Sequence, residues 1–64
     1  MIENPTKIQP LLMNIKETAE FLKISRASVY RLIQEKGLPV YRLGGSVRTK
    51  PDEVEKWLVS QKAE

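Results

Sequence analysis

The sequence predicts a small, mainly α-helical domain with one β-hairpin, in the order helix, helix, strand, strand, helix. Apolar side chains recur at helical spacing in three segments of the chain. A glycine pair separates two short β-rich runs between the second and the third of these segments. A chain of 64 residues forms one domain with a small core, because it hides only about 60% of its unfolded surface on folding. This length leaves no room for a catalytic domain with a cleft.

The folded domain is expected over residues 11–60, between two terminal segments. Residues 1–10 contain two prolines and mostly polar side chains without sustained periodicity, which is typical of a flexible arm. Residues 61–64 are expected to form a short tail. The N-terminus does not resemble a signal peptide, and no apolar run approaches the roughly 18 residues needed to cross a bilayer. We therefore expect a soluble cytoplasmic protein.

The first helix is predicted over residues 15–22. Asn14 and Glu17 have the spacing of a capping box, in which each side chain accepts a hydrogen bond from the backbone N–H of the other. Apolar or small side chains then share one helical face at positions 15, 18, 19 and 22. Because Ala19 is small, a second helix can approach this face closely.

The second helix is predicted to begin after a very short turn. Ser25 is a typical N-cap residue, and Ile24 before it is able to pack on Val29. Gly37 has the position of the glycine that follows a helix C-cap. The apolar stripe of this helix consists of Val29, Leu32 and Ile33. The side chains that face away from this stripe are Arg26, Ala27, Tyr30, Arg31 and Gln34.

The glycine pair at positions 44 and 45 is the strongest local hairpin signal in the chain. Two registers are open for this hairpin. A loop of the two glycines alone puts Leu43 opposite Ser46. A loop that includes Ser46 puts Leu43 opposite Val47 and Arg42 opposite Arg48. We favour the second register, because it separates apolar from charged side chains on the two faces.

The last helix is predicted to start near Lys50. Pro51 suits the first helical position, and the acidic residues that follow are favourable at the positive end of the helix dipole. Val54, Trp57 and Leu58 have the spacing of one helical face. We expect this face to complete the core against the first two helices.

The composition excludes several kinds of functional site. The chain has no cysteine and no histidine, which removes disulfides, thiol nucleophiles, the usual zinc ligands and the commonest general base. The acids and hydroxyls that remain have no basic partner, no metal-binding spacing and no phosphate-cradling glycine loop. We therefore expect no enzymatic activity, no metal, no cofactor and no small-molecule substrate.

The positive charge is concentrated in the middle of the chain. The net charge is only +3, but residues 25–50 hold six Lys or Arg against a single Glu. Residues 51–64 hold two Lys against four acids. A cationic block favours phosphate binding, because each neutralised phosphate releases condensed counterions. A solvated basic face is the simpler alternative.

The order of the elements is that of a winged helix-turn-helix domain, whose second helix enters the major groove of double-stranded DNA. Arginine binds guanine or phosphate in a bidentate manner, glutamine can contact adenine, and hydroxyls at a helix N-terminus can donate to phosphate. The DNA-binding residues predicted on the second helix are Ser25, Arg26, Ala27, Ser28, Tyr30, Arg31 and Gln34. The hairpin could follow the backbone into the adjacent minor groove through Arg42, Gly44, Gly45, Ser46 and Arg48.

Three segments of the chain resemble the excisionase and AlpA-like group of MerR-type winged helix-turn-helix proteins. They are LLMNIKETAEFLKISRASVYRLI at 11–33, LPVYRLGGSVR at 38–48 and VEKWL at 54–58. The resemblance covers residues 11–59. It implies that base contacts come from Arg26, Ser28, Tyr30 and Arg31. It also implies that the hairpin and its flank contact DNA through Arg42, Ser46, Arg48 and Lys50.

The resemblance implies one of two related functions. Excisionases bind repeated sites beside an attachment site, bend the DNA and direct integrase toward excision, whereas other members are small phage or plasmid transcription regulators. Our leading hypothesis is an excisionase-like recombination directionality factor on the nucleoid. Its expected partners are double-stranded DNA, an integrase or recombinase, and further copies of itself side by side on DNA, since one small domain has a short footprint. MerR proteins proper add a long dimerisation helix and an effector domain, and because this sequence departs from them in both, the resemblance does not imply effector sensing.

A hypothesis from a different class is a protein-interaction module. In that case the face formed by Val54, Trp57 and Leu58, or the arm over residues 1–10, would engage a protein partner. The response of duplex binding to salt separates the two hypotheses, because only phosphate contacts weaken steeply as salt rises.

Overall fold

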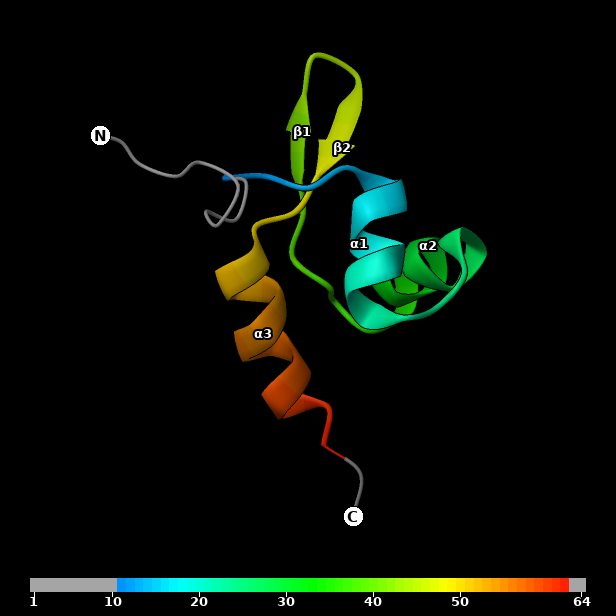
Figure 1. Ribbon diagram of the computed structural model, residues 1–64, viewed down its shortest axis with the longest axis vertical. Coiled ribbons are helices and arrows are strands. Elements are labelled where there is room, and N and C mark those ends of the chain that lie inside the picture. The colour runs from blue at the N-terminus through cyan, green and yellow to red at the C-terminus, as the bar shows by residue number, and fades with distance from the viewer. Residues whose placement is uncertain (1–10, 63–64) are drawn as a thin grey trace, which may run out of the picture.

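The computed structural model describes residues 11–62, and the arm predicted over residues 1–10 lies outside this range. The chain forms the helices α1 (Ile15–Leu22) and α2 (Arg26–Glu35), the strands β1 (Tyr41–Leu43) and β2 (Ser46–Arg48), and the helix α3 (Pro51–Ser60). The predicted order of elements is confirmed. The helices α1 and α2 pack side by side, while the hairpin and α3 extend toward opposite ends of the molecule (Figure 1).

The helix α1 has the bounds and the capping box that the sequence predicts. The Asn14 Oδ1 accepts the Glu17 N–H at 2.8 Å, and the Glu17 Oε1 accepts the Asn14 N–H at 2.9 Å. At the other end Lys23 has a left-handed backbone with φ 60°. The Lys23 N–H donates to the Glu20 carbonyl and the Ile24 N–H donates to the Ala19 carbonyl. These two bonds are those of a Schellman motif, which ends the helix abruptly and makes the short turn before α2.

The helix α2 also begins and ends where its capping residues predict. The Ser25 Oγ accepts the Ser28 N–H at 3.1 Å, so Ser25 is the N-cap. Beyond the end of the helix, Gly37 has φ 71°, a backbone conformation that residues other than glycine rarely adopt. Val29 is fully buried, and Leu32 and Ile33 are partly buried against the same core. The predicted apolar stripe of α2 is therefore confirmed.

The register that we favoured for the hairpin is wrong. The observed Cα partners are Tyr41 with Arg48, Arg42 with Val47, and Leu43 with Ser46. Gly44 and Gly45 have φ 55° and 89°, and a two-residue type I′ turn requires positive φ at both central residues. Separation of apolar from charged faces selects a register only where one face is buried, and all six strand residues are exposed or half-buried. The turn geometry therefore selects the register.

The helix α3 begins at Pro51 as predicted, but only part of its apolar face is buried. Val54 is fully buried, and the partly buried Trp57 donates its indole N–H to the Lys36 carbonyl at 2.9 Å. Leu58, which we expected in the core, is 49% exposed. The end of α3 extends past the α1–α2 pair (Figure 1), so Trp57 still reaches the core while Leu58 next to it stays exposed.

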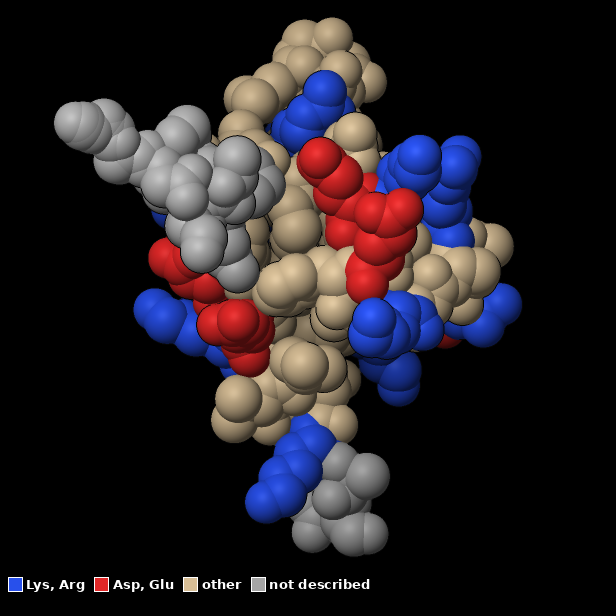
Figure 2. All heavy atoms as spheres, in the orientation of Figure 1, with Lys and Arg blue, Asp and Glu red and all other residues tan. Residues whose placement is uncertain are grey.

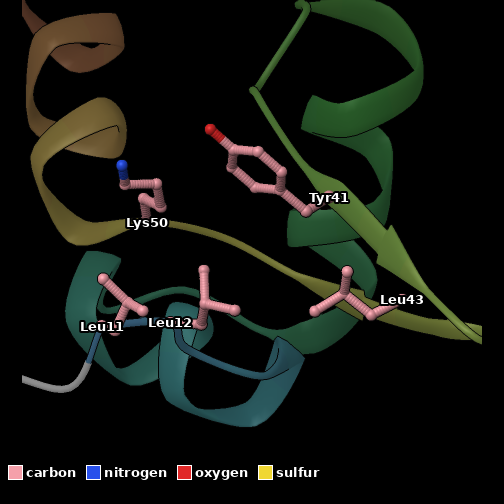
Figure 3. Close-up of a pocket in the computed structure, with 5 residues that line it drawn as sticks. All are labelled: Leu11, Leu12, Tyr41, Leu43 and Lys50. Atoms are coloured by element: carbon pink, nitrogen blue, oxygen red, sulfur yellow. The ribbon is translucent and has the colours of Figure 1, made fainter.

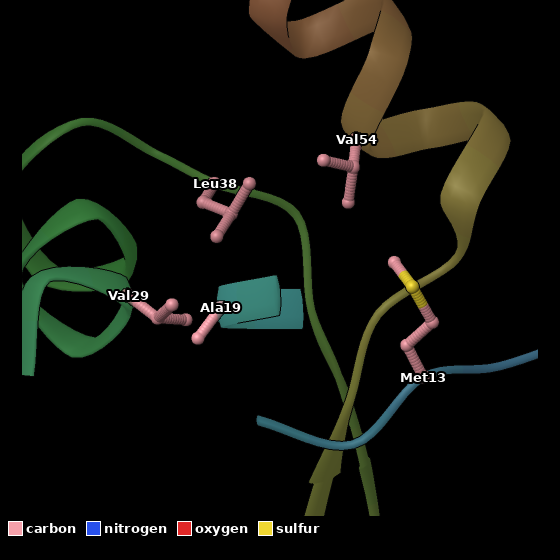
Figure 4. Close-up of a cluster of buried hydrophobic side chains, with 5 residues drawn as sticks. All are labelled: Met13, Ala19, Val29, Leu38 and Val54. Atoms are coloured by element: carbon pink, nitrogen blue, oxygen red, sulfur yellow. The ribbon is translucent and has the colours of Figure 1, made fainter. Parts of the chain in front are cut away.

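The core includes two residues from connecting segments that helical periodicity does not identify. Met13 and Leu38 are 4% and 3% exposed, and they join Ala19, Val29 and Val54 from the three helices (Figure 4). Met13 also forms an isolated antiparallel bridge with Thr49, directly after β2. The segment before α1 is therefore attached to the end of the hairpin.

Candidate nucleic-acid interface

The exposed side of α2 carries a stripe of polar and basic side chains. Positions 26, 27, 30, 31 and 34 lie on neighbouring turns of the helix opposite the buried Val29. All five side chains are exposed, and Tyr30 retains 47% of its accessible surface. The structure therefore brings together on one face the predicted residues Arg26, Ala27, Tyr30, Arg31 and Gln34.

The hydroxyls of the two serines at the start of α2 have different hydrogen-bonding roles. The Ser25 Oγ accepts from the Ser28 backbone and donates its hydrogen to the Ser28 Oγ at 2.9 Å. This arrangement uses the Ser25 hydroxyl for capping and leaves the Ser28 hydroxyl hydrogen for another acceptor. Ser28 lies in the first turn, where the helix dipole favours an anion.

The hairpin, residues 41–48, which we call the wing, holds its two arginines on opposite faces. Because successive residues of a strand alternate between faces, Arg42 shares one face with Val47 while Arg48 shares the other with Tyr41. Arg42 is exposed. Arg48 is half-buried and donates from Nη1 to the Val47 carbonyl at 3.0 Å. The structure thus does not bring Arg42 and Arg48 to one face, as the favoured register would have done.

The tip of the wing is narrow. Gly44 and Gly45 are exposed, and an added Cβ at either position would have no atom within 4 Å. Ser46 next to them is half-buried. The glycines therefore satisfy the turn conformation and leave the tip without side-chain bulk.

Lys50 lies at the base of the wing, where it is the N-cap residue of α3. Its side chain borders a hollow of about 240 Å³ together with Leu11, Leu12, Tyr41 and Leu43 (Figure 3). The hollow is lined mainly by aliphatic and aromatic carbon, with the Lys50 ammonium and the Tyr41 hydroxyl as polar groups. Lys50 is thus separate from the exposed tip of the wing with which we grouped it.

A hydrogen bond that the sequence analysis missed joins the base of the wing to α3. The Tyr41 hydroxyl donates to the Glu53 carboxylate, with oxygen–oxygen distances of 2.9 and 2.8 Å. This hydrogen bond, with smaller effects of desolvation and of the negative charge, raises the pKa of Tyr41 above its ordinary value. The available signal was an aromatic strand residue followed by an acid in the first turn of the next helix.

Charge is unevenly distributed over the surface. On the face seen in Figure 2, acidic side chains gather over α1 and over the start of α3, while basic side chains lie over the wing, along the α2 side of the molecule and beside α3. Residues 11–62 contain no group of three or more His, Cys, Asp or Glu side chains placed to hold a metal ion. None of the helices in the described part of the chain is long and apolar enough to cross a membrane.

Comparison with known proteins identifies one family. The family described as "Helix-turn-helix domain" matches residues 12–62, a span that includes all five helices and strands. No curated protein and no solved structure matches the chain.

Proposed function

The chain belongs to the helix-turn-helix domain family and is a small DNA-binding protein with a winged fold, and we propose that it is an excisionase-like recombination directionality factor. In this role it binds repeated duplex sites near an attachment site, bends the DNA and directs an integrase toward excision. The observation that carries the DNA-binding part of this proposal is the exposed stripe of α2, which presents two arginines, a tyrosine and a glutamine in a chain that also forms a glycine-tipped hairpin. The proposed location is the cytoplasm, on the nucleoid.

We assign base contacts to the exposed stripe of α2 in the major groove. Arg26 and Arg31 can each form a bidentate pair with guanine, and Gln34 can pair with adenine. Ala27 is small and allows the helix to approach the base edges, and Ser28 can donate to a phosphate. The Ser25 hydroxyl caps the helix, so its contribution is to hold the first turn of α2 in place.

We assign backbone contacts to the wing. Because Arg42 and Arg48 extend from opposite faces, a wing that enters the minor groove edge first would direct one arginine toward each sugar–phosphate wall. The tip at Gly44, Gly45 and Ser46 has little side-chain volume, which suits close approach to the backbone. Lys50, at the base, would contact phosphate outside the groove.

One domain of this size contacts a short stretch of DNA, so useful specificity requires several copies side by side or a protein partner. Further copies of this chain and an integrase or recombinase are the proposed partners. A small transcriptional regulator uses the same interface, and the position of the gene separates the two functions. An adjacent integrase gene and attachment site support the excisionase role, whereas a divergent promoter without an integrase supports the regulator.

Footprinting on the DNA that surrounds the gene tests the proposal. We expect protection of short repeated sites, and the affinity should fall with salt at a log–log slope of about −0.9 per phosphate contacted. Bending at these sites, measured by the dependence of gel mobility on site position, should accompany binding. Protection of a single promoter site without bending would reject the excisionase role and favour the regulator.

The exposure of Leu58 and Val59 on α3, 49% and 74%, favours a second candidate function, a protein-interaction module. Of the predicted face of Val54, Trp57 and Leu58, only Leu58 is exposed, because Val54 is buried and Trp57 is partly buried in the core. Chemical-shift mapping with added duplex distinguishes the candidates. Perturbations at Arg26 and Arg31 support DNA binding through α2, and a spectrum that the duplex leaves unchanged supports the module.

A further inference from the structure

Two threonines from distant parts of the chain form a fully buried polar contact. Thr18 in α1 and Thr49 after β2 are both 0% exposed, and their Oγ1 atoms lie 2.8 Å apart. The Thr18 Oγ1 also lies 2.7 Å from the Asn14 carbonyl, to which it donates its only hydrogen. The Thr49 hydroxyl must therefore be the donor to Thr18. The hydroxyls form a directed chain from Thr49 through Thr18 to the N-cap residue of α1.

Backbone bonds reinforce this connection at the same point. The Met13 N–H donates to the Thr49 carbonyl at 2.8 Å, and the Thr49 N–H donates to the Met13 carbonyl at 2.9 Å. Thr49 directly follows the wing, and α1 packs on α2 in the core that contains Ala19 and Val29. The Thr18–Thr49 contact thus lies on the structural route between the wing and α2.

We propose that Thr18 and Thr49 are positioning residues that fix the wing relative to α2, so that both elements contact one duplex at the same time. This inference depends on the DNA-binding function proposed above. Valine has the shape of threonine and would fill these buried positions without a polar group. The hydroxyl pair differs from such a pair of valines in having a preferred direction and distance, which orient the end of β2 on α1.

Valine variants of the two threonines separate their role in orienting the wing from their contribution to stability. In Thr18→Val the Thr49 hydroxyl loses its acceptor, and the folding equilibrium constant should fall by about 5- to 150-fold. In Thr49→Val the Thr18 hydroxyl still donates to Asn14, so the loss should be smaller. The double variant Thr18→Val/Thr49→Val removes both hydroxyls and leaves no unpaired buried group. Its stability in urea should therefore be close to that of the wild type.

DNA binding by the double variant is the main test, with one arginine on the wing and one on α2 as matched probes. In the wild type, Arg42→Ala should weaken binding to the footprinted site about tenfold. In the double-valine background the same substitution should have a clearly smaller effect, because the backbone bonds to Met13 still attach Thr49 but the hydroxyls no longer orient the wing toward the DNA. Arg31→Ala on α2 should have the same effect in both backgrounds.

The orientation of the wing in the free protein gives a second readout. Residual dipolar couplings of the wing amides, measured relative to those of α2, should differ between the wild type and the double variant. Equal couplings, or an Arg42→Ala effect of equal size in both backgrounds, would overturn the proposal. If the wild type binds no duplex, the proposed function fails, whereas the couplings still decide whether the threonines orient the wing.

Discussion

The helix α2 and the wing both present basic side chains to solvent, but different forces hold them. The position of α2 is fixed by a buried apolar face, with Val29 fully enclosed and a serine cap at its start. The wing has no buried residue between Tyr41 and Arg48 and depends on a glycine turn and on contacts at its base. Core substitutions should therefore destabilise α2. The wing should instead respond to substitutions in its turn and at its base.

The largest effect should come from the core anchor of α2. Val29→Ala removes two methyl groups from a fully buried site and should lower the free energy of unfolding by about 2–3 kcal/mol. Urea denaturation followed by circular dichroism measures this change. The matched control is Val59→Ala on α3, where the side chain is 74% exposed and a change within about 0.5 kcal/mol is expected. Equal losses in both variants would contradict the view that α2 is held by the core.

The second largest effect is a loss of DNA-binding affinity when the exposed side of α2 is changed. Arg31→Ala should weaken binding to the specific site by about 1–3 kcal/mol if the guanidinium meets a base edge. Titrations with the footprinted duplex and with a random duplex measure it. Lys56→Ala on α3 removes one exposed positive charge elsewhere and should have little effect on either duplex. An equal loss on both duplexes for Arg31→Ala would reassign this arginine to phosphate.

The turn of the wing should be sensitive to backbone conformation alone. Gly45→Ala places a Cβ in open space at φ 89°, so only the positive φ is unfavourable, at about 1–2 kcal/mol. Gly45→Asn should cost less, because asparagine tolerates positive φ better. Thermal unfolding and the amide shifts of the wing measure both variants. If alanine and asparagine were equally tolerated, the turn would not be what determines the register.

The smallest effect is a loss of stability at alkaline pH, which comes from the Tyr41–Glu53 contact at the base of the wing. Hydrogen bonding to Glu53 raises the pKa of Tyr41, so the contribution of the phenol to stability is fully present below its ordinary pKa near 10. It is lost as the pH rises through the raised pKa of the folded state. The wild type should therefore lose more stability in urea between pH 9 and 12 than Tyr41→Phe does. Glu53→Gln should show the same weakened pH dependence, and parallel losses in all three proteins would count against the contact.

The exposure of Leu58 and the register of the wing differ from prediction for the same physical reason. Helical spacing places Leu58 on the same face as Val54, but only tertiary contacts decide how far along α3 that face is covered. The favoured register assumed that one face of the wing is buried, and the structure leaves both faces accessible. In both cases the prediction assumed a packing partner that the structure does not supply at that position.

The bounds and caps of α1 and α2, and the exposed stripe of α2, follow from local sequence. These features depend on interactions within about four residues, and the capping box of Asn14 and Glu17 is formed by residues only three positions apart. The burial of Met13, the hydrogen bond from Tyr41 to Glu53 and the hydroxyl pair of Thr18 and Thr49 depend instead on how the elements pack. The hydroxyl pair joins residues 31 positions apart, and no local propensity specifies a contact over that distance, because it exists only once the helices and the wing have packed together.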